Sequence, residues 1–113
     1  MRRAAIICAI CLWAAGAVAA QSKVYQGEEA AALRCANAMA LTAVALSDAG
    51  LMSDGEKSVM LEITVVILDR HVSGTWAQKK AALEIVRDRR DVAETLADFQ
   101  EVAQKCLRQF PIN

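Results

Sequence analysis

The distribution of proline constrains the fold of this chain more than any other sequence feature. The only proline among the 113 residues is Pro111, so no proline interrupts residues 1–110. Proline disrupts helix interiors, whereas Ala, Leu, Glu, Gln and Arg, in which the chain is rich, favour helix. No run of β-branched residues alternates with polar ones as in a half-buried strand. The sequence therefore predicts an all-α fold.

Turn residues mark the end of the first expected helix. This helix is predicted to run from Gly27 to Ala49, because Gly50 suits the left-handed residue that closes a helix. Leu51 is then expected to fold back onto Leu46. The helix carries many alanines, and such small side chains let a neighbouring helix approach closely. We therefore expect tight packing along it.

Capping residues mark the starts of the next two helices. Ser53 can form a capping box with Glu56, which predicts a second helix from there to about Val72. This helix is apolar nearly all round, so it is expected to be central in its bundle or covered by a second chain. The third helix is expected to begin with Ser73 or Thr75 as its cap.

The apolar face shifts part of the way along the last helical segment. A continuous helix would keep its apolar stripe, so the shift predicts a break near residues 88–91, with Asp91 and Glu94 as a new capping pair. A fourth helix is then expected over about Val92–Arg108. One bent helix over residues 75–108 is the alternative.

Two cysteines, Cys35 and Cys106, are expected to form a disulfide bond. They are the only cysteines beyond the N-terminal segment, and such a pair in an exported protein is usually bonded. The bond requires the first helix to begin beside the end of the last, with β-carbons about 4 Å apart. An antiparallel up-and-down arrangement satisfies this. The prediction is a small antiparallel helical bundle of three to four helices with one disulfide.

Residues 1–20 have the organisation of a cleavable signal peptide. Two arginines precede an uncharged, apolar stretch that ends in small residues, which suits cleavage after Ala19 or Ala20. Cys8 and Cys11 lie inside this apolar stretch, where a metal-binding or redox role is not expected. An uncleaved membrane anchor is the alternative, since the stretch is at the lower limit of length for a span.

The predicted mature chain is a single helical domain over residues 21–113, located in the periplasm or secreted. Without Arg2 and Arg3, the thirteen Lys and Arg become eleven against thirteen Asp and Glu, which gives a formal charge of −2. The charges are mixed in sign along the chain. Neither a nucleic-acid partner nor membrane association after cleavage is expected.

The sequence carries few signs of catalytic or metal chemistry. His71 is the only histidine, and a structural role at a helix end is expected for it. Met39, Met52 and Met60 are spread over different turns, so core filling explains them better than copper binding does. No cofactor and no metal site are therefore expected.

Acidic pairs occur at three places, but nothing in the sequence marks a cleft in which one member would be desolvated. The pairs are Glu28 with Glu29, Asp88 with Asp91, and Glu62 with Asp69. The charged run at residues 87–91 is expected to be a solvated helix junction, with a docking patch for an acidic partner as the alternative.

Protein binding is the function that the sequence favours. The second helix has more apolar surface than a small bundle need bury, which indicates a homodimer or another protein partner. The expected contact residues are Val59, Ile63, Val66, Ile67 and Phe110. One alternative is an acid- or stress-induced periplasmic chaperone; the chain is similar in size and class alone to the small disulfide-containing helical chaperones of the acid-stressed periplasm. The other is a small enzyme or metal-handling protein.

Overall fold

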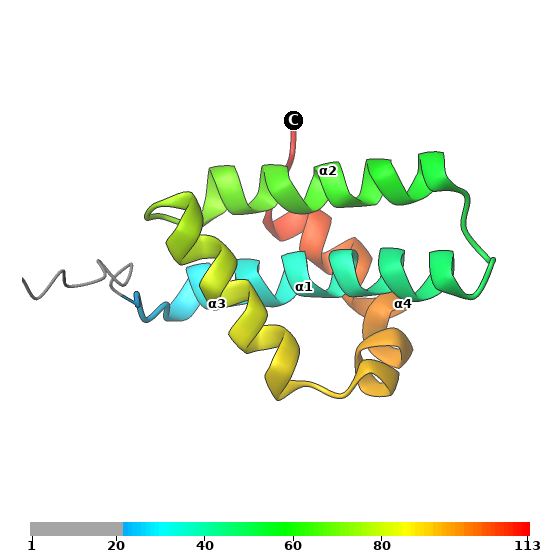
Figure 1. Ribbon diagram of the computed structural model, residues 1–113. Helices are drawn as coiled ribbons and strands as arrows, with labels where there is room; N and C mark the ends of the chain where they lie inside the picture. The colour runs from blue at the N-terminus through cyan, green and yellow to red at the C-terminus, as the bar shows by residue number, and fades with distance from the viewer. Residues whose placement is uncertain (1–21) are drawn as a thin grey trace, which may run out of the picture.

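The computed structural model describes residues 22–113, which form four α-helices and no strand (Figure 1). The helices are α1 (Gly27–Asp48), α2 (Asp54–His71), α3 (Trp76–Arg89) and α4 (Val92–Gln109). The prediction of an all-α helical bundle is confirmed for this range. The predicted signal peptide over residues 1–20, with Cys8 and Cys11, lies outside the described residues.

Helix α1 ends in the way that its glycine predicts. Gly50 has a φ of 72°, in the left-handed region. Its N–H donates to the Ser47 carbonyl at 3.0 Å, and the Leu51 N–H donates to the Leu46 carbonyl at 2.8 Å. This pair of bonds is a Schellman motif, which satisfies carbonyls that the last turn leaves unpaired. Leu51 therefore contacts Leu46 through a backbone hydrogen bond, and the residue Leu51 is 75% exposed.

Helices α2 and α3 begin at capping side chains. The Ser53 hydroxyl accepts a hydrogen bond from the Glu56 N–H at 3.2 Å, as predicted. The capping box is not completed, because Glu56 Oε1 accepts from the Ser53 hydroxyl at 3.0 Å and not from the Ser53 N–H. At α3 the cap is Thr75, whose hydroxyl accepts from the Gln78 N–H at 3.1 Å. The Gln78 side chain in turn accepts from the Thr75 N–H at 2.9 Å, which completes a capping box. Of the two residues expected to cap α3, the structure therefore selects Thr75.

The last helical segment is broken, as its shifted apolar face predicts. Helix α3 ends at Arg89 and α4 begins at Val92, so the single bent helix is excluded. Asp91 caps α4 by accepting from the Ala93 N–H at 3.1 Å. The reciprocal contact predicted for Glu94 is not formed. Instead, the Thr95 hydroxyl donates to the Asp91 carbonyl at 3.0 Å.

Helix α1 is the central helix of the bundle. In Figure 1, α2 runs antiparallel to α1, α3 crosses α1 obliquely and α4 lies behind it. Within residues 22–113, the extensive helix–helix contacts are all contacts of α1 with the other three helices. Of the two positions expected for the second helix, central in its bundle or covered by a second chain, the first is therefore wrong, and the second stays a prediction. Small side chains decide the central position, because the alanines of α1 let neighbours approach it from several sides.

The core lies where α2 and α4 face α1. Ala32 and Ala36 of α1 are fully buried, and Ile67 and Leu68 of α2 pack against them in one cluster. Phe110, which follows α4 directly, closes the cluster. Burying large apolar side chains is worth roughly 1.5–3 kcal/mol each. The core therefore holds α2 and α4 to the same central helix.

The predicted disulfide joins α1 to α4. Cys35 and Cys106 are 3% and 4% exposed, and their Cα atoms lie 5.5 Å apart. This separation is within the usual range for a disulfide. The bond fixes the first half of α1 beside the last turn of α4, as the sequence predicts.

Two of the five residues predicted to contact a partner belong to the core. Ile67 is 0% exposed and Phe110 is 4% exposed, so neither contributes to an exposed surface. The prediction is corrected for these two residues. Because α2 is apolar on several sides, its periodicity does not tell which side faces α1.

Helix α1 is also the one helix among residues 22–113 whose length and apolar composition would allow it to cross a membrane. Half of its most apolar stretch is buried inside the bundle. The burial of α1 by its three neighbours accounts for this composition without a membrane.

Candidate functional site

A groove runs between α1 and α4 beside the disulfide. It has a volume of about 250 Å³. Its apolar walls include Ala31 and Ala38 of α1 and Val102 of α4, and both cysteines line it. The disulfide holds the two walls at this point, so the width of the groove is fixed by a covalent bond.

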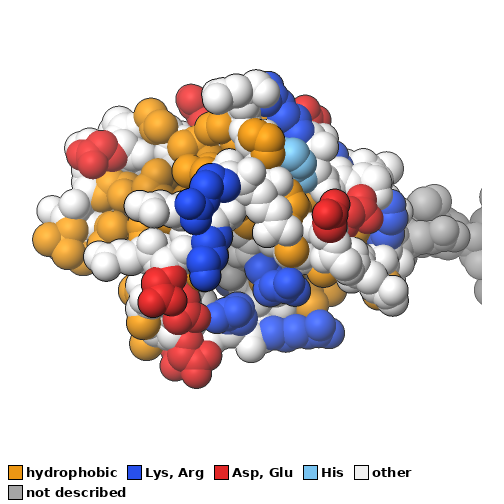
Figure 2. All heavy atoms as spheres, turned by 180° about the vertical axis from the view of Figure 1, so that it is seen from behind, with side chains coloured by type: hydrophobic (Ala, Val, Ile, Leu, Met, Phe, Trp, Pro, Cys, Tyr) orange, Lys and Arg blue, Asp and Glu red, His pale blue; other side chains and the backbone are white. Residues whose placement is uncertain are grey.

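Basic side chains gather along this groove. Arg34 projects from α1, Lys105 from α4, and Arg90 from the junction between α3 and α4. Figure 2 shows Lys and Arg side chains collected in the middle of the face that carries α4. Among residues 22–113, Asp98 is the only carboxylate that lines the groove, so three positive charges face one negative charge there. The groove is therefore electropositive although the chain as a whole is nearly neutral.

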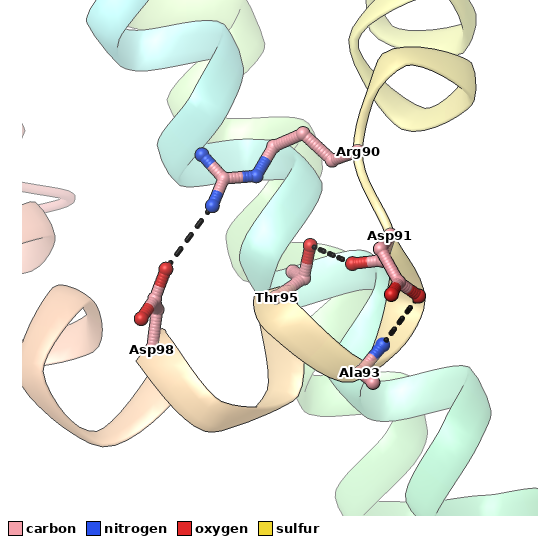
Figure 3. A network of polar contacts seen from close by, with 5 residues as sticks. All are labelled: Arg90, Asp91, Ala93, Thr95 and Asp98. Atoms are coloured by element: carbon pink, nitrogen blue, oxygen red, sulfur yellow. Dashed lines mark hydrogen bonds and ion pairs between the residues drawn. The ribbon is translucent and has the colours of Figure 1, made fainter.

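An ion pair with another residue of the groove, Asp98, holds the Arg90 side chain in place. Its Nη2 donates to Asp98 Oδ2 at 3.1 Å, while Asp91 next to it caps α4 (Figure 3). The two side chains are 36% and 55% exposed, so the ion pair contributes at most about 1 kcal/mol to stability. Within the run at residues 87–91, Arg90 thus turns inward. The other residues of the run are exposed and Arg90 is partly exposed, so the junction is solvated as predicted, while Arg90 also lines the groove.

Two hydrogen-bond donors at the groove are buried without an acceptor in residues 22–113. One is Nδ2 of Asn37, a residue only 3% exposed, and the other is Nε of Arg90. Both residues line the groove. Leaving a buried donor unpaired costs about 1–3 kcal/mol, so such groups are rare in folded proteins. The groove therefore has two lining residues whose buried donors no acceptor in the described chain pairs.

A separate polar network joins the start of α1 to the turn between α2 and α3. The Ser73 N–H donates to Glu29 Oε1 at 2.7 Å, the Tyr25 hydroxyl donates to the Ser73 carbonyl at 2.7 Å, and Lys23 bonds the Ser73 hydroxyl. Hydrogen bonding from the side chain and backbone of Ser73 lowers the pKa of Glu29, and the charges of Lys23 and Lys79 lower it further. The network is a structural tether, because its hydrogen bonds join the start of α1 to the α2–α3 turn.

The remaining residues predicted for a partner surface lie along one flank of α2. Val59, Ile63 and Val66 are spaced i, i+4 and i+7, which places them on one side of a helix. Val59 is 55% exposed, and the other two are partly exposed. We call these three residues the α2 stripe. Ile63 also packs against the core, so the stripe is available for contact mainly through Val59 and the exposed parts of Ile63 and Val66.

The residues considered for chemistry lie at separate places in the described chain. His71 contacts the Pro111 carbonyl through Nε2 at 2.9 Å and packs edge-on against Phe110, with ring centroids 5.3 Å apart. Met39 lies in the core and Met60 packs against it, while Met52 lies in the α1–α2 connection. Within residues 22–113, no three His, Cys, Asp or Glu side chains converge as metal ligands.

The acidic pairs are also scattered. Glu29 accepts from Ser73, and Asp88 pairs with its neighbour Arg87 at 3.1 Å on the surface. Glu62 and Asp69 are exposed on α2. In the described chain none of these carboxyls lines the α1–α4 groove.

The groove residues Arg34, Asn37 and Lys105 are absent from the sequence-based predictions. A signal for two of them exists, because Arg34 and Lys105 directly precede Cys35 and Cys106. Pairing the cysteines therefore also brings the two cations to the same place. No known family model, no curated protein and no solved structure matches the chain.

Proposed function

We propose that the chain is a small protein-binding module that works in an oxidising compartment outside the cytoplasm. The α2 stripe is the observation that carries the proposal. It presents apolar side chains at i, i+4 and i+7, the spacing with which a helix engages another helix or a groove. The disulfide and the signal-peptide pattern support an exported location.

The α2 stripe begins at a shallow hollow. This hollow has a volume of about 380 Å³ and is lined by Met52, Gly55, Glu56, Val59 and Met60. Figure 2 shows hydrophobic side chains collected toward the end of the molecule where α1 connects to α2. Apolar surface beside a hollow, with methionines that adapt their shape, suits contact with an apolar side chain of a protein partner.

Site-specific photo-crosslinking in living cells tests this proposal. A photoreactive residue replaces Val59 in one strain and Val65 in another. Both are valines of α2 with similar exposure, 55% and 47%, but Val65 lies on the opposite flank. The captured proteins are identified by mass spectrometry, and the peptides of the chain itself report its N-terminus and its disulfide.

We expect one dominant product at position 59 that is absent at position 65. Val59→Asp should abolish this product in a co-purification experiment, and Val65→Asp should not. A crosslink to the same chain would identify a homodimer as the partner. Equal capture at the two positions, or capture of nothing, would overturn the role of the stripe. If the purified chain still contained residues 1–20, the proposed cleavage of the signal peptide would be overturned.

A second candidate is a chaperone that exposes its apolar faces in acid. The tether at Glu29 favours it, because protonation of that carboxyl weakens its hydrogen bonding to Ser73. The test is suppression of client aggregation at acidic and neutral pH. A chain that remains folded in acid and protects no client would exclude this candidate.

A further inference from the structure

We propose that the α1–α4 groove binds the carboxylate of a small ligand that has an apolar body. This proposal is independent of the α2 stripe, because it concerns different helices. It is carried by three features of the groove: its charge, its unpaired donors and the apolar character of its walls.

The charge of the groove favours a single negative charge. Arg34, Arg90 and Lys105 line it together with one carboxylate, Asp98. Arg90 and Asp98 already pair at 3.1 Å. The other two cations of the groove, Arg34 and Lys105, form no ion pair with a carboxylate within residues 22–113. They come from facing helices and can approach one anion from two sides. Asp98 in the lining would repel a doubly charged phosphate more than a carboxylate.

The unpaired donors require an acceptor that the described chain does not supply. Asn37 and Arg90 both line the groove, and the Nδ2 of Asn37 and the Nε of Arg90 are buried without partners in the described chain. A carboxylate has two oxygens and accepts about four hydrogen bonds. It can therefore satisfy donors beyond the two cations. Charge-assisted bonds of this kind are about twice as strong as neutral ones.

The walls of the groove favour a ligand whose carboxylate is attached to an apolar group. Ala31, Ala38, Val102 and Phe110 supply apolar surface, and the disulfide lies between them. The volume of about 250 Å³ is below the range of roughly 300–1,000 Å³ that holds drug-sized molecules. A short fatty acid or an aromatic acid fits this size. The C-terminal residue of a peptide presents the same chemistry, an apolar side chain beside a carboxylate.

Titration of the full, disulfide-bonded chain with hexanoate, followed by NMR of the ¹⁵N-labelled backbone, tests the proposal. Hexanamide is the matched neutral probe, and sulfate is the probe for unspecific anion adsorption. Arg34→Gln and Lys105→Gln remove the two free cations of the groove. Arg70→Gln is the control, because Arg70 is an exposed cation of α2 that does not line the groove. Circular dichroism verifies that each variant keeps its helices.

We expect saturable shifts confined to α1, α4 and the α3–α4 junction with hexanoate. Arg34→Gln and Lys105→Gln should each weaken binding about tenfold, the usual scale for a charge-assisted bond, and Arg70→Gln less than about twofold. Equal shifts with hexanamide or with sulfate would overturn the proposal. Equal weakening by Arg34→Gln and Arg70→Gln would also overturn it, as would the absence of any saturable shift.

A peptide ending in leucine distinguishes the two sources of the carboxylate. The peptide is titrated with its terminus free and with its terminus amidated. Tighter binding of the free peptide than of hexanoate identifies a chain terminus as the ligand, and the reverse order identifies a free small acid. Either order supports the site if amidation abolishes peptide binding. Undiminished binding of the amidated peptide would contradict the carboxylate requirement.

Discussion

Removal of the disulfide is the perturbation with the largest expected effect on stability. The bond joins residues with a sequence separation of 71, so the loop that it closes contains α2, α3 and most of α1 and α4. In the oxidised chain, the bond that closes this loop lowers the conformational entropy of the unfolded state. Replacing both Cys35 and Cys106 with alanine releases the restriction without leaving an unpaired thiol.

The loop length sets the size of the effect. The chain-entropy relation assigns about 4.4 kcal/mol to a loop of this length at 25 °C. The free energy of unfolding of domains of this size is about 5–15 kcal/mol, so the loss is roughly 30–90% of the total. It corresponds to a fall in Tm of roughly 15–35 °C. Because both cysteines are buried, loss of their sulfur atoms adds a cavity cost.

Urea unfolding of three samples separates the loop from the cavity. The oxidised chain, the reduced chain and the double alanine variant are compared by circular dichroism. The reduced chain keeps both sulfur atoms, so its loss of stability reports the loop alone. We expect a lower midpoint and a steeper dependence on urea in both altered samples, since the open unfolded chain exposes more surface. A midpoint of the reduced chain equal to that of the oxidised chain would refute this reasoning.

Three other sets of substitutions are expected to change the stability of the chain in a defined direction. Glu29→Gln should reduce the acid sensitivity of the chain in thermal melts. The reason is that the lowered pKa of Glu29 gives stability that is present above its unfolded pKa and lost as pH falls through its folded pKa; an unchanged acid loss would contradict this. Ile67→Ala should cost about 2–5 kcal/mol in urea unfolding because Ile67 is fully buried, whereas Val65→Ala on the same helix should cost less than about 0.5 kcal/mol. Gly50→Ala should cost about 1–2 kcal/mol because its φ is 72°, whereas Gly55→Ala at the start of α2 should stabilise by up to about 1 kcal/mol, because the added methyl group meets only Ser53 Oγ, at an ordinary contact distance of 3.9 Å. Equal effects within either pair would show that burial or backbone conformation is not the cause.

Local features of the fold could be predicted from the sequence. Gly50 ends α1, Ser53 and Thr75 cap the next two helices, and the shifted apolar face marks the break before α4. These features depend on hydrogen bonds between residues close in sequence. The disulfide could be predicted as well, because only two cysteines remained to be paired.

Features that depend on the arrangement of helices could not be predicted. The apolar content of α2 suggested a central position, yet α1 occupies the centre because its alanines admit close neighbours. The same limit explains why Ile67 was assigned to a surface that the structure buries. The groove needs Arg90 to turn inward at the helix junction, and no local pattern specifies that.

The position of the disulfide also determines how the bundle would respond to mechanical force. Tension applied between Asn113 and a point before Cys35 passes from the start of α1 through the sulfur bridge to the last turn of α4. Helices α2 and α3 lie inside the covalent ring, so the force bypasses them. The enclosed helices would therefore remain assembled while the ends are pulled, and they would extend only after a reductant opens the bridge.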